Sequence, residues 1–183
     1  MSVRFTRDPL ANPEALIRRV YAYAAYRLGH GPDAEDVTSE VFERALRYRA
    51  SYDRSKGEPL GWLLGIARRC VSAALAARAE QRTAPELAHE TDGRSAEEDS
   101  IRRLTLAAAV AQLGERDQEL ISLRYGADLT AAQIARILEL EKNAVEVALH
   151  RALGRLRSIL KSEETSPAKT AGVKRTVGRT SAL

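Results

Sequence analysis

The stretch LAAAVAQLGERDQELISLRYGADLTAAQIARILELEKNAVEVALHRALGRLR, residues 106–157, decides the fold of this chain. Its apolar residues recur at helical spacing, and a short turn around residues 139–141 separates the last two helical segments. Thr130 and Gln133 form a capping box that begins the first of these two segments. Two short helices joined in this way form a helix-turn-helix, which places its second helix in the major groove of DNA.

The exposed face of the second helix departs from what DNA binding requires. Glu146 repels phosphates, and Val147 and Ala148 are aliphatic at positions where cations and hydroxyls are expected. The turn also carries Glu139 at a position where glycine commonly relieves strain. An ordinary helical hairpin with a solvated charged face is therefore the alternative interpretation of this stretch.

Residues upstream of this stretch predict a bundle of three amphipathic helices. The first helix covers about 13–28, and Gly29 to Pro32 end it. Asp33 can cap the second helix, and Pro59 fits the first turn of the third, which ends near Arg78. The apolar face of the first helix consists of Leu16, Ile17, Val20, Tyr21 and Leu28, and that of the second consists of Val37, Val41, Phe42 and Ala45.

The distribution of charge separates these two helical parts. Residues 1–78 carry 13 cationic and 9 anionic side chains, a net charge of +4, whereas residues 79–100 carry 2 and 7, a net charge of −5. The predicted class is all-α, with two small helical bundles joined by a flexible linker and the helix-turn-helix in the second. We expect an N-terminal extension over 1–12, a first bundle over 13–78, an acidic flexible linker over 79–100, a second bundle over 101–160 and a disordered basic tail over 161–183.

The composition excludes several classes of protein. Cys70, the single cysteine, rules out an internal disulfide framework, and its place on an apolar stripe predicts a buried structural thiol. The three histidines lie far apart, and no P-loop or dinucleotide-binding turn is present, so neither a metal, a cofactor nor an enzyme is expected. No apolar run is long enough to span a bilayer, and the start lacks a signal-peptide core. We therefore expect a soluble, cytoplasmic protein without membrane insertion.

Five strings carry a family resemblance when they are taken in order. They are DAEDVTSEVFERAL (33–46), GWLLGIARR (61–69), LGERDQELISLRY (113–125), LTAAQIARILEL (129–140) and ALHRALGRLR (148–157). In this order and spacing the chain resembles bacterial sigma factors of the small, two-domain extracytoplasmic-function type, which belong to the sigma-70 family. The resemblance covers residues 13–160.

The resemblance implies that the second helix docks on the clamp helices of core RNA polymerase. The residues that it assigns to this contact are Asp36, Val37, Glu40, Val41, Phe42 and Arg44. The apolar members would supply contact area, and the charged members would fix the register at the rim. Because Val41 and Phe42 are adjacent, we expect one to point inward and the other outward.

The resemblance assigns the minus-ten promoter element to the loop over 49–58 and the helix after it. In this family the element is melted, and a non-template base is flipped into a protein pocket. The candidate groups are Tyr48, Tyr52, Arg54, Lys56, Arg68 and Arg69, whereas Trp62 is expected to be a core residue. The family often continues its IAR string with Asn and, four residues later, Asp. This chain has Arg69 and Ala73 there, so it keeps phosphate affinity but lacks the two side chains that the family often has at these positions.

The second bundle would read the minus-thirty-five element in this family. The assigned residues are Lys142, Asn143, Glu146, Val147, His150 and Arg151. His150 and Arg151 can donate to base edges or phosphates, whereas Glu146 would either repel phosphates or accept a hydrogen bond from a cytosine amino group. We therefore expect upstream promoter recognition to be weak or unusual.

The predicted function is a sigma factor that binds core RNA polymerase at its clamp helices and flap, recognises promoter DNA and helps to melt it. An anti-sigma factor or another regulator is a further candidate partner. One alternative is a dimeric regulator that binds a palindromic operator, which leaves the string at 33–46 unexplained. Another is a sigma-like protein whose second module binds a protein instead of DNA, and Val147 and Ala148 motivate it.

Overall fold

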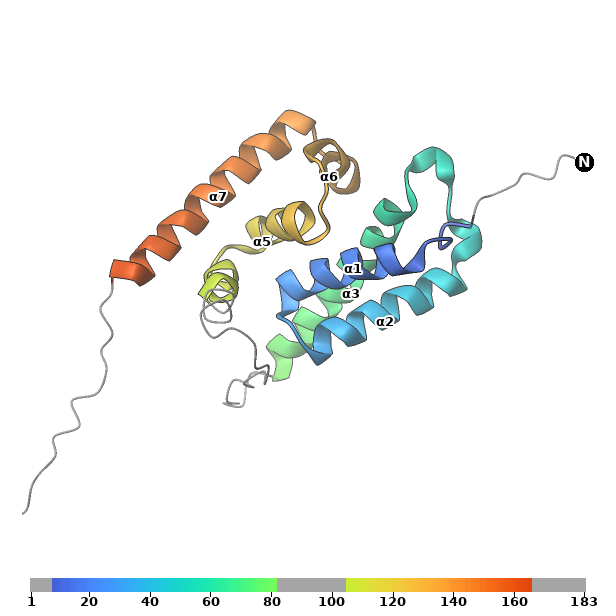
Figure 1. Ribbon diagram of the computed structural model, residues 1–183, viewed down its shortest axis with the longest axis horizontal. Helices are drawn as coiled ribbons and strands as arrows, with labels where there is room; N and C mark the ends of the chain where they lie inside the picture. Colours follow the sequence, from blue (N-terminus) through green and yellow to red (C-terminus); the bar gives the residue numbers. More distant parts are fainter. Residues whose placement is uncertain (1–7, 82–104, 166–183) are drawn as a thin grey trace, which may run out of the picture.

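The computed structural model describes residues 8–81 and 105–165, and these residues form helices and turns only (Figure 1). The helices are α1 (Pro13–Leu28), α2 (Pro32–Arg47), α3 (Pro59–Gln81), a helical stretch over 105–111, α5 (Glu115–Ile121), α6 (Ala131–Leu138) and α7 (Lys142–Thr165); the short turns are the 3-10 turns η1 (Arg49–Ser51) and η2 (Arg54–Lys56) and the π-helical turn η3 (Ser122–Gly126). The all-α class predicted from the sequence is confirmed.

Helices α1, α2 and α3 form the first module, as their apolar periodicity predicted. Gly29 ends α1 with a φ of 90°, a left-handed conformation that glycine adopts without strain. The prediction that Asp33 caps α2 is wrong, because Gly31 is the N-cap residue and Pro32 occupies the first turn. Asp33 instead accepts a hydrogen bond from Arg78 Nε near the end of α3, at 2.7 Å.

The core of the first module follows the predicted stripes with one exception. The side chains of Val20, Tyr23, Val41, Leu63 and Leu64 are fully buried. Ile17, which we expected on the buried face of α1, is 43% exposed and lies outside that stripe. The predicted buried thiol is confirmed, since Cys70 is 1% exposed. Burial is also the main reason that the pKa of this thiol is raised.

Helix α3 is a long and largely apolar helix. By length and composition alone, its segment Pro59–Glu80 is long and apolar enough to cross a membrane, with a mean hydropathy of 1.3, so the expectation that no apolar run reaches this length is wrong. A core helix of a folded protein can have the same length and composition, and Leu63, Leu64 and Ala67 are fully buried in this core. The apolar character of α3 is thus used in packing.

The second module contains the predicted helix-turn-helix, formed by α6 and α7. The capping box at the start of α6 is present, because Thr130 accepts from Gln133 N and the Gln133 side chain accepts from Thr130 N. Glu139 in the turn has a φ of 55°, so an acidic residue occupies the left-handed position that glycine usually fills. The residues Ile134, Val145 and Leu149 of the inward face are all buried.

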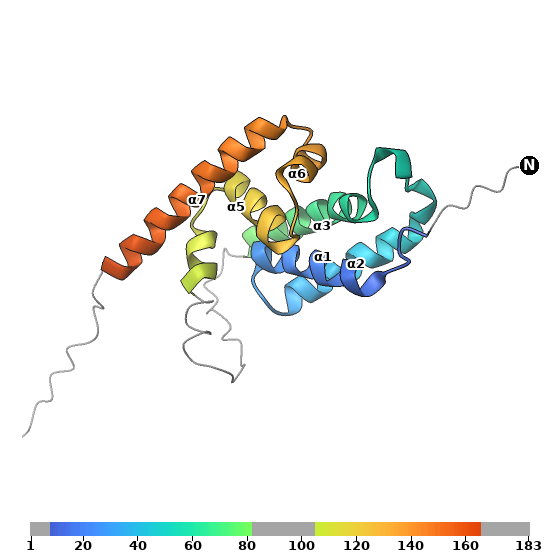
Figure 2. The ribbon, with the colours of Figure 1, turned by 45° about the horizontal axis from the view of Figure 1, so that its top comes forward.

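The two modules share one hydrophobic core, which the sequence did not predict. Val20 and Tyr23 of α1 belong to the same buried cluster as Leu120, Leu123 and Ile134 of the second module. Figure 2 shows the second module lying along α1 and α3, with α7 extending away from the first module. The described parts therefore form one packed unit.

The predicted linker and tail fall mainly outside the described residues. Residues 79–81 belong to α3, and 82–100 are not described. Residues 161–165 continue α7, so the prediction that the tail begins at 161 is wrong for these five positions, and the rest of the tail is not described. Neither proline nor glycine follows Gly154 in the sequence until Pro167, so nothing breaks the helix earlier.

Candidate functional site

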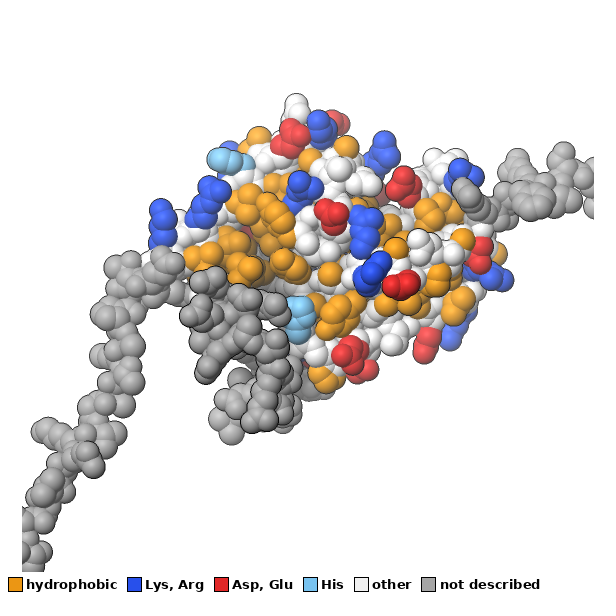
Figure 3. Space-filling model, viewed as in Figure 1, with side chains coloured by type: hydrophobic (Ala, Val, Ile, Leu, Met, Phe, Trp, Pro, Cys, Tyr) orange, Lys and Arg blue, Asp and Glu red, His pale blue; other side chains and the backbone are white. Residues whose placement is uncertain are grey.

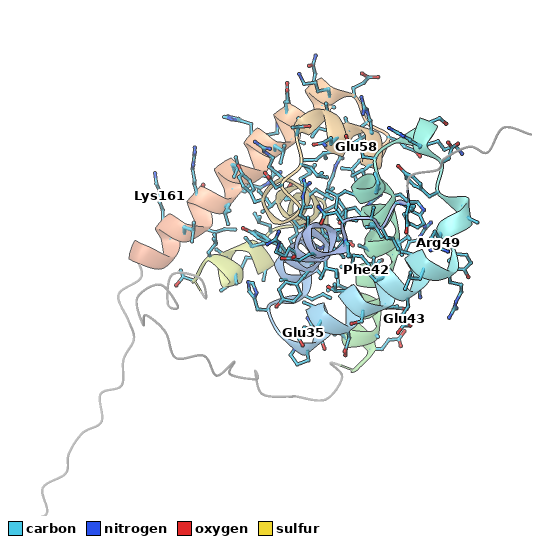
Figure 4. All side chains as sticks on the ribbon, turned by 45° about the vertical axis from the view of Figure 1, so that its right-hand side comes forward. Glu35, Phe42, Glu43, Arg49, Glu58 and Lys161 are labelled. Carbon is cyan, nitrogen blue, oxygen red and sulfur yellow. The ribbon has the colours of Figure 1, made fainter. Side chains whose placement is uncertain are left out.

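The outer face of α2 carries the residues assigned to polymerase binding. Val37 and Val41 are 5% and 0% exposed, so both pack inside the bundle and are unavailable at the surface. This corrects their assignment as contact residues, because their i,i+4 spacing places both on the inward stripe of α2. Phe42 is half-buried, which agrees with the expected split between adjacent residues. Figure 4 labels Phe42 between Glu35 and Glu43, two exposed acids on α2.

The charged members of this group lie at the surface of α2. Asp36 is exposed, and Arg44 Nη2 donates to Glu40 Oε1 at 2.5 Å across one helical turn. Leu46 is an exposed apolar residue at the end of α2, 59% accessible, and it was not singled out from the sequence. Its position four residues after Phe42 was the available signal. Together Phe42 and Leu46 form a small apolar patch bordered by charge.

Aromatic and cationic side chains gather where the loop after α2 meets the start of α3. Tyr48 is 55% exposed, and Arg54 and Lys56 are exposed on η2. Tyr52 is half-buried, because its hydroxyl donates to the Gly57 carbonyl at 2.9 Å and its ring centroid lies 5.6 Å from that of Trp62. Trp62 is itself only half-buried, so it is a pocket wall rather than a full core residue.

A cavity of about 260 Å³ opens beside this aromatic pair. Tyr52 and Trp62 of the first module line one side of it. Gln133, Arg136 and Ile137, all from α6, line the other side. Tyr52, one of the two tyrosines predicted to handle the minus-ten element, therefore shares a cavity with the helix-turn-helix, although the two lie far apart in the sequence.

The two adjacent arginines of α3 have different surroundings. Arg69 is exposed. Arg68 is half-buried, and its Nε donates to Glu119 Oε1 of α5 at 2.8 Å. Its Nη1 also donates to the carbonyl of Ile137, near the end of α6, at 3.3 Å. One of the predicted DNA-binding cations thus has two nitrogens bonded to the second module, although its side chain is 38% exposed.

Glu119 is the centre of a polar cluster between the modules. Its side chain is 16% exposed and accepts hydrogen bonds from Arg27 Nη1 at 2.6 Å and from the Tyr23 hydroxyl at 3.1 Å. Burial raises the pKa of Tyr23 well above its usual value, and the nearby Glu119 carboxylate raises it further. Glu119 was not predicted as a site residue from the sequence, since no local pattern distinguishes it from the other acids of α5.

The first turns of α7 present the residues assigned to upstream DNA. Lys142, Asn143, Glu146, Val147, His150 and Arg151 are all exposed. Figure 3 shows cationic side chains along the outer edge of α7, interrupted by acidic and apolar groups near its start. Lys142 Nζ lies 3.3 Å from Glu146 Oε1. The charge of this lysine is therefore paired with the acid on the same face, which weakens its attraction for phosphate. Val147 is 50% exposed.

The described residues offer no group of three or more His, Cys, Asp or Glu side chains that could hold a metal ion. The surfaces described above on α2, on the loop after it and on α7 instead combine basic, acidic, aromatic and apolar side chains. Such surfaces suit binding to nucleic acid and to protein.

Family models match both modules. The model described as "Sigma-70 region 2" matches residues 14–81, and "Sigma-70, region 4" matches residues 103–156. Together the two matches cover more than half of the chain. They fall on the first module and on the module with the helix-turn-helix, in the order expected from the sequence.

Individual relatives agree with the family models. The ECF RNA polymerase sigma factor BldN of Streptomyces coelicolor is 33% identical over 147 residues, which cover 77% of this chain and 56% of BldN. The ECF RNA polymerase sigma factor SigK of Mycobacterium ulcerans is 30% identical over 150 residues, 78% of this chain and 80% of SigK. The chain thus spans little more than half the length of BldN.

A solved structure shows a similar fold. It is that of the sigma factor RpoE in complex with the anti-sigma factor NepR from Bartonella quintana. The TM-score is 0.65 at 19% identity, and the match covers 80% of this chain and 92% of that one. At this level of identity the likeness concerns the fold.

Proposed function

This chain belongs to the sigma-70 family, as a sigma factor of the extracytoplasmic-function type, and from that membership we propose that it binds core RNA polymerase and directs promoter recognition and melting. The observation that carries the proposal is the ordered match of region 2 and region 4 to the two helical modules. An operator-binding regulator would need only the second module, and it leaves the first unexplained.

The proposed polymerase contact is the exposed part of α2. Asp36, Glu40 and Arg44 supply charge, and Phe42 and Leu46 supply apolar area, so the patch has the apolar centre and polar rim of a protein interface. Because Val37 and Val41 are buried, the proposed polymerase contact has a smaller apolar surface than the sequence predicted. The charged rim would mainly set orientation and association rate.

The proposed minus-ten surface consists of Tyr48, Tyr52, Arg54, Lys56, Arg68 and Arg69. Aromatic rings stack on unpaired bases without strong sequence preference, and cations hold the backbone of the single strand. Four of these side chains, Tyr48, Arg54, Lys56 and Arg69, are exposed and available as the structure stands. Arg68 Nε and Nη1 are bonded to Glu119 and to the Ile137 carbonyl, so these two nitrogens are free for DNA only when those contacts break.

Upstream recognition by α7 is proposed to be weak. The ion pair between Lys142 and Glu146 neutralises a cation that would otherwise attract phosphate. Replacing Glu146 by lysine adds a cation and frees Lys142, so an electrophoretic shift with upstream duplex DNA should show tighter binding and a steeper dependence on salt. A variant that binds this duplex no better than the wild type contradicts the explanation.

A second candidate role for this module is binding to a protein. Val147, a large aliphatic residue that is 50% exposed on the recognition face, favours it. Because the structurally similar RpoE is bound to an anti-sigma factor, we also propose that a protein regulator of this kind binds the present chain. Loss of regulator binding, but not of DNA binding, in Val147→Ser would support that role.

The sigma-70 family is not enzymatic, and its extracytoplasmic-function members are soluble regulators of transcription. We infer that this chain catalyses no bond change itself and acts in the cytoplasm, where polymerase and promoter DNA are found.

Transcription in vitro tests the main proposal. Purified core polymerase is combined with the full chain and fragmented genomic DNA, and the 5′ ends of the transcripts are mapped. The expected result is a set of start sites that require the chain and share a minus-ten motif, with little upstream motif. Transcription that does not change when the chain is added would refute the proposal.

A further inference from the structure

A single carboxylate of the second module faces three hydrogen-bond donors of the first. Glu119 of α5 accepts from Arg27 Nη1 at 2.6 Å, from Arg68 Nε at 2.8 Å and from the Tyr23 hydroxyl at 3.1 Å. Arg27 and Tyr23 come from α1, and Arg68 comes from α3. All three contacts therefore break if the modules separate, and none breaks if they stay together.

The surroundings of Arg27 make this cluster strong in the packed state. The Arg27 side chain is 3% exposed, and its Nε has no hydrogen-bond partner among the described residues. A buried guanidinium depends on its counter-ion, because an unpaired buried charge is costly. Apart from Glu119, the ion partner of Arg27 in the described chain is Glu115, at 3.6 Å and 79% exposed. Glu119 is thus the main group that makes burial of Arg27 favourable.

Arg19 adds a second set of contacts between the modules. Its Nε donates to the Ala127 carbonyl and its Nη2 to the Asp128 carbonyl, both at 2.7 Å. These carbonyls follow η3, so Arg19 fixes the turn that leads into the helix-turn-helix. The contact involves no carboxylate, and like the contacts of Glu119 it is lost when the modules separate.

We propose that Glu119 is a latch that holds the two modules closed and withholds Arg68 from nucleic acid, and that single-stranded DNA opens the modules by competing for Arg68. The proposal rests on the proposed function, because Arg68 belongs to the proposed minus-ten surface. In the closed state α6 also forms one wall of the cavity beside Tyr52 and Trp62. Opening therefore releases a phosphate-binding cation and uncovers an aromatic surface together.

Closure affects the two DNA-binding surfaces unequally. The recognition face of α7 is exposed in the closed state, whereas Arg68 and the Trp62 cavity are in contact with the second module. When the competent state is only partly populated, apparent affinity falls by that fraction. The latch thus lowers the affinity of the free protein for single-stranded DNA without changing its upstream surface.

Trp62 provides a native probe of closure, since it is the only tryptophan in the chain and lines the shared cavity. The experiment compares the full-length wild type with Glu119→Gln, which keeps the side-chain shape and removes the charge. Trp62 emission and acrylamide quenching report opening. Fluorescence anisotropy with labelled oligothymidylate of about ten nucleotides, at one fixed low salt concentration, reports binding of single strands.

The expected result for Glu119→Gln is red-shifted, more readily quenched emission and binding of the oligonucleotide that is about tenfold tighter or more, because hydrogen bonds to charged groups are lost from the closed state only. Asp117→Asn is the matched control. Asp117 lies on the same helix and pairs with Arg155 inside the second module, so the charge change is identical but no contact between modules is lost.

Tyr23→Phe keeps the core shape and removes one donor to Glu119, so it should move both signals in the same direction by a smaller amount. This variant keeps the test valid if Glu119→Gln loses helicity by circular dichroism. Unchanged Trp62 emission in a folded Glu119→Gln protein overturns the latch. Opening without a gain in affinity beyond that of Asp117→Asn overturns the competition for Arg68.

The Trp62 measurement needs neither polymerase nor a promoter. If the chain failed to support transcription while Glu119→Gln still opened the modules, the proposed function would be wrong and the latch would stand. If transcription succeeded and Trp62 did not respond, the latch alone would be wrong.

Discussion

Replacing Gly126 by alanine inserts a methyl group at the point where the two modules touch. A Cβ at this position lies 2.9 Å from the Ala22 carbonyl oxygen, 3.1 Å from the Ala22 carbonyl carbon and 3.1 Å from Tyr23 Cα. All three atoms belong to the backbone of α1, so no side chain can rotate away. To reach an ordinary contact distance of about 3.5 Å, α1 or η3 must shift by roughly half an ångström.

The size of the effect follows from two opposing terms. Overpacking of this kind costs about 1–3 kcal/mol, whereas alanine in a helical segment recovers roughly 0.5–1 kcal/mol relative to glycine. The expected net loss is about 0–2.5 kcal/mol for the packed state, which lowers its equilibrium constant by a factor of up to roughly 60.

Urea unfolding of the full chain, together with Trp62 emission in native buffer, measures this loss. Gly154→Ala in α7 is the control, because no atom lies within 4 Å of a Cβ placed there, and it should gain about 0.5–1 kcal/mol. Gly126→Ala should either lower the unfolding midpoint or red-shift Trp62 by separating the modules. A Gly126→Ala protein with normal emission and the same gain as Gly154→Ala would refute the close approach of the modules.

Three further predictions concern single side chains. Val41→Ala should lower the free energy of unfolding in urea by about 2 kcal/mol, because it leaves a cavity in the core. Phe42→Ala should lower the free energy of unfolding less and should instead weaken polymerase binding in a pull-down. Equal loss of polymerase binding in both variants would contradict the assignment of Val41 to the core and Phe42 to the polymerase contact. Thr130→Ala removes the capping box of α6 and should cost about 1 kcal/mol, again by urea unfolding, with the exposed Ser162→Ala as a neutral comparison. The raised pKa of Tyr23 keeps its phenol protonated in the folded protein, so its contribution to stability is complete below the ordinary tyrosine pKa of 10.0 and is lost as the pH rises above that value. Between neutral pH and about pH 11, Tyr23→Phe should therefore lose less stability than the wild type. Equal losses in the two proteins would contradict the raised pKa of Tyr23.

Local signals were sufficient to predict most of the secondary structure. Gly29 and Pro32 mark the turn between α1 and α2, and Thr130 with Gln133 marks the start of α6. These boundaries could be predicted because each signal acts over a few residues. Errors occurred where two local interpretations competed. Asp33 could cap a helix but pairs with Arg78, 45 residues away, and the helical signal of α7 continued past residue 160.

The sequence predicted which residues form the candidate site, but not how buried each of them is or which of them are engaged by the second module. Tyr52 and Lys56 follow from the local pattern and the family strings, and the exposed face of α7 follows from helical periodicity. The burial of Val37 and Val41 could have been inferred from the same periodicity, since both lie on the inward stripe of α2. The half-buried position of Trp62 depends on α6, which the sequence places more than 60 residues away.

By itself the sequence determined the helices, the helix-turn-helix and the family, because periodicity, caps and ordered strings are encoded within short segments. Only the tertiary structure decided that the modules share a core and that Glu119 holds Arg68 and Arg27. These partners are 51 and 92 residues from Glu119 along the chain. Their pairing arises because packing α5 and η3 against α1 and α3 excludes water from those charges, which must then find one another.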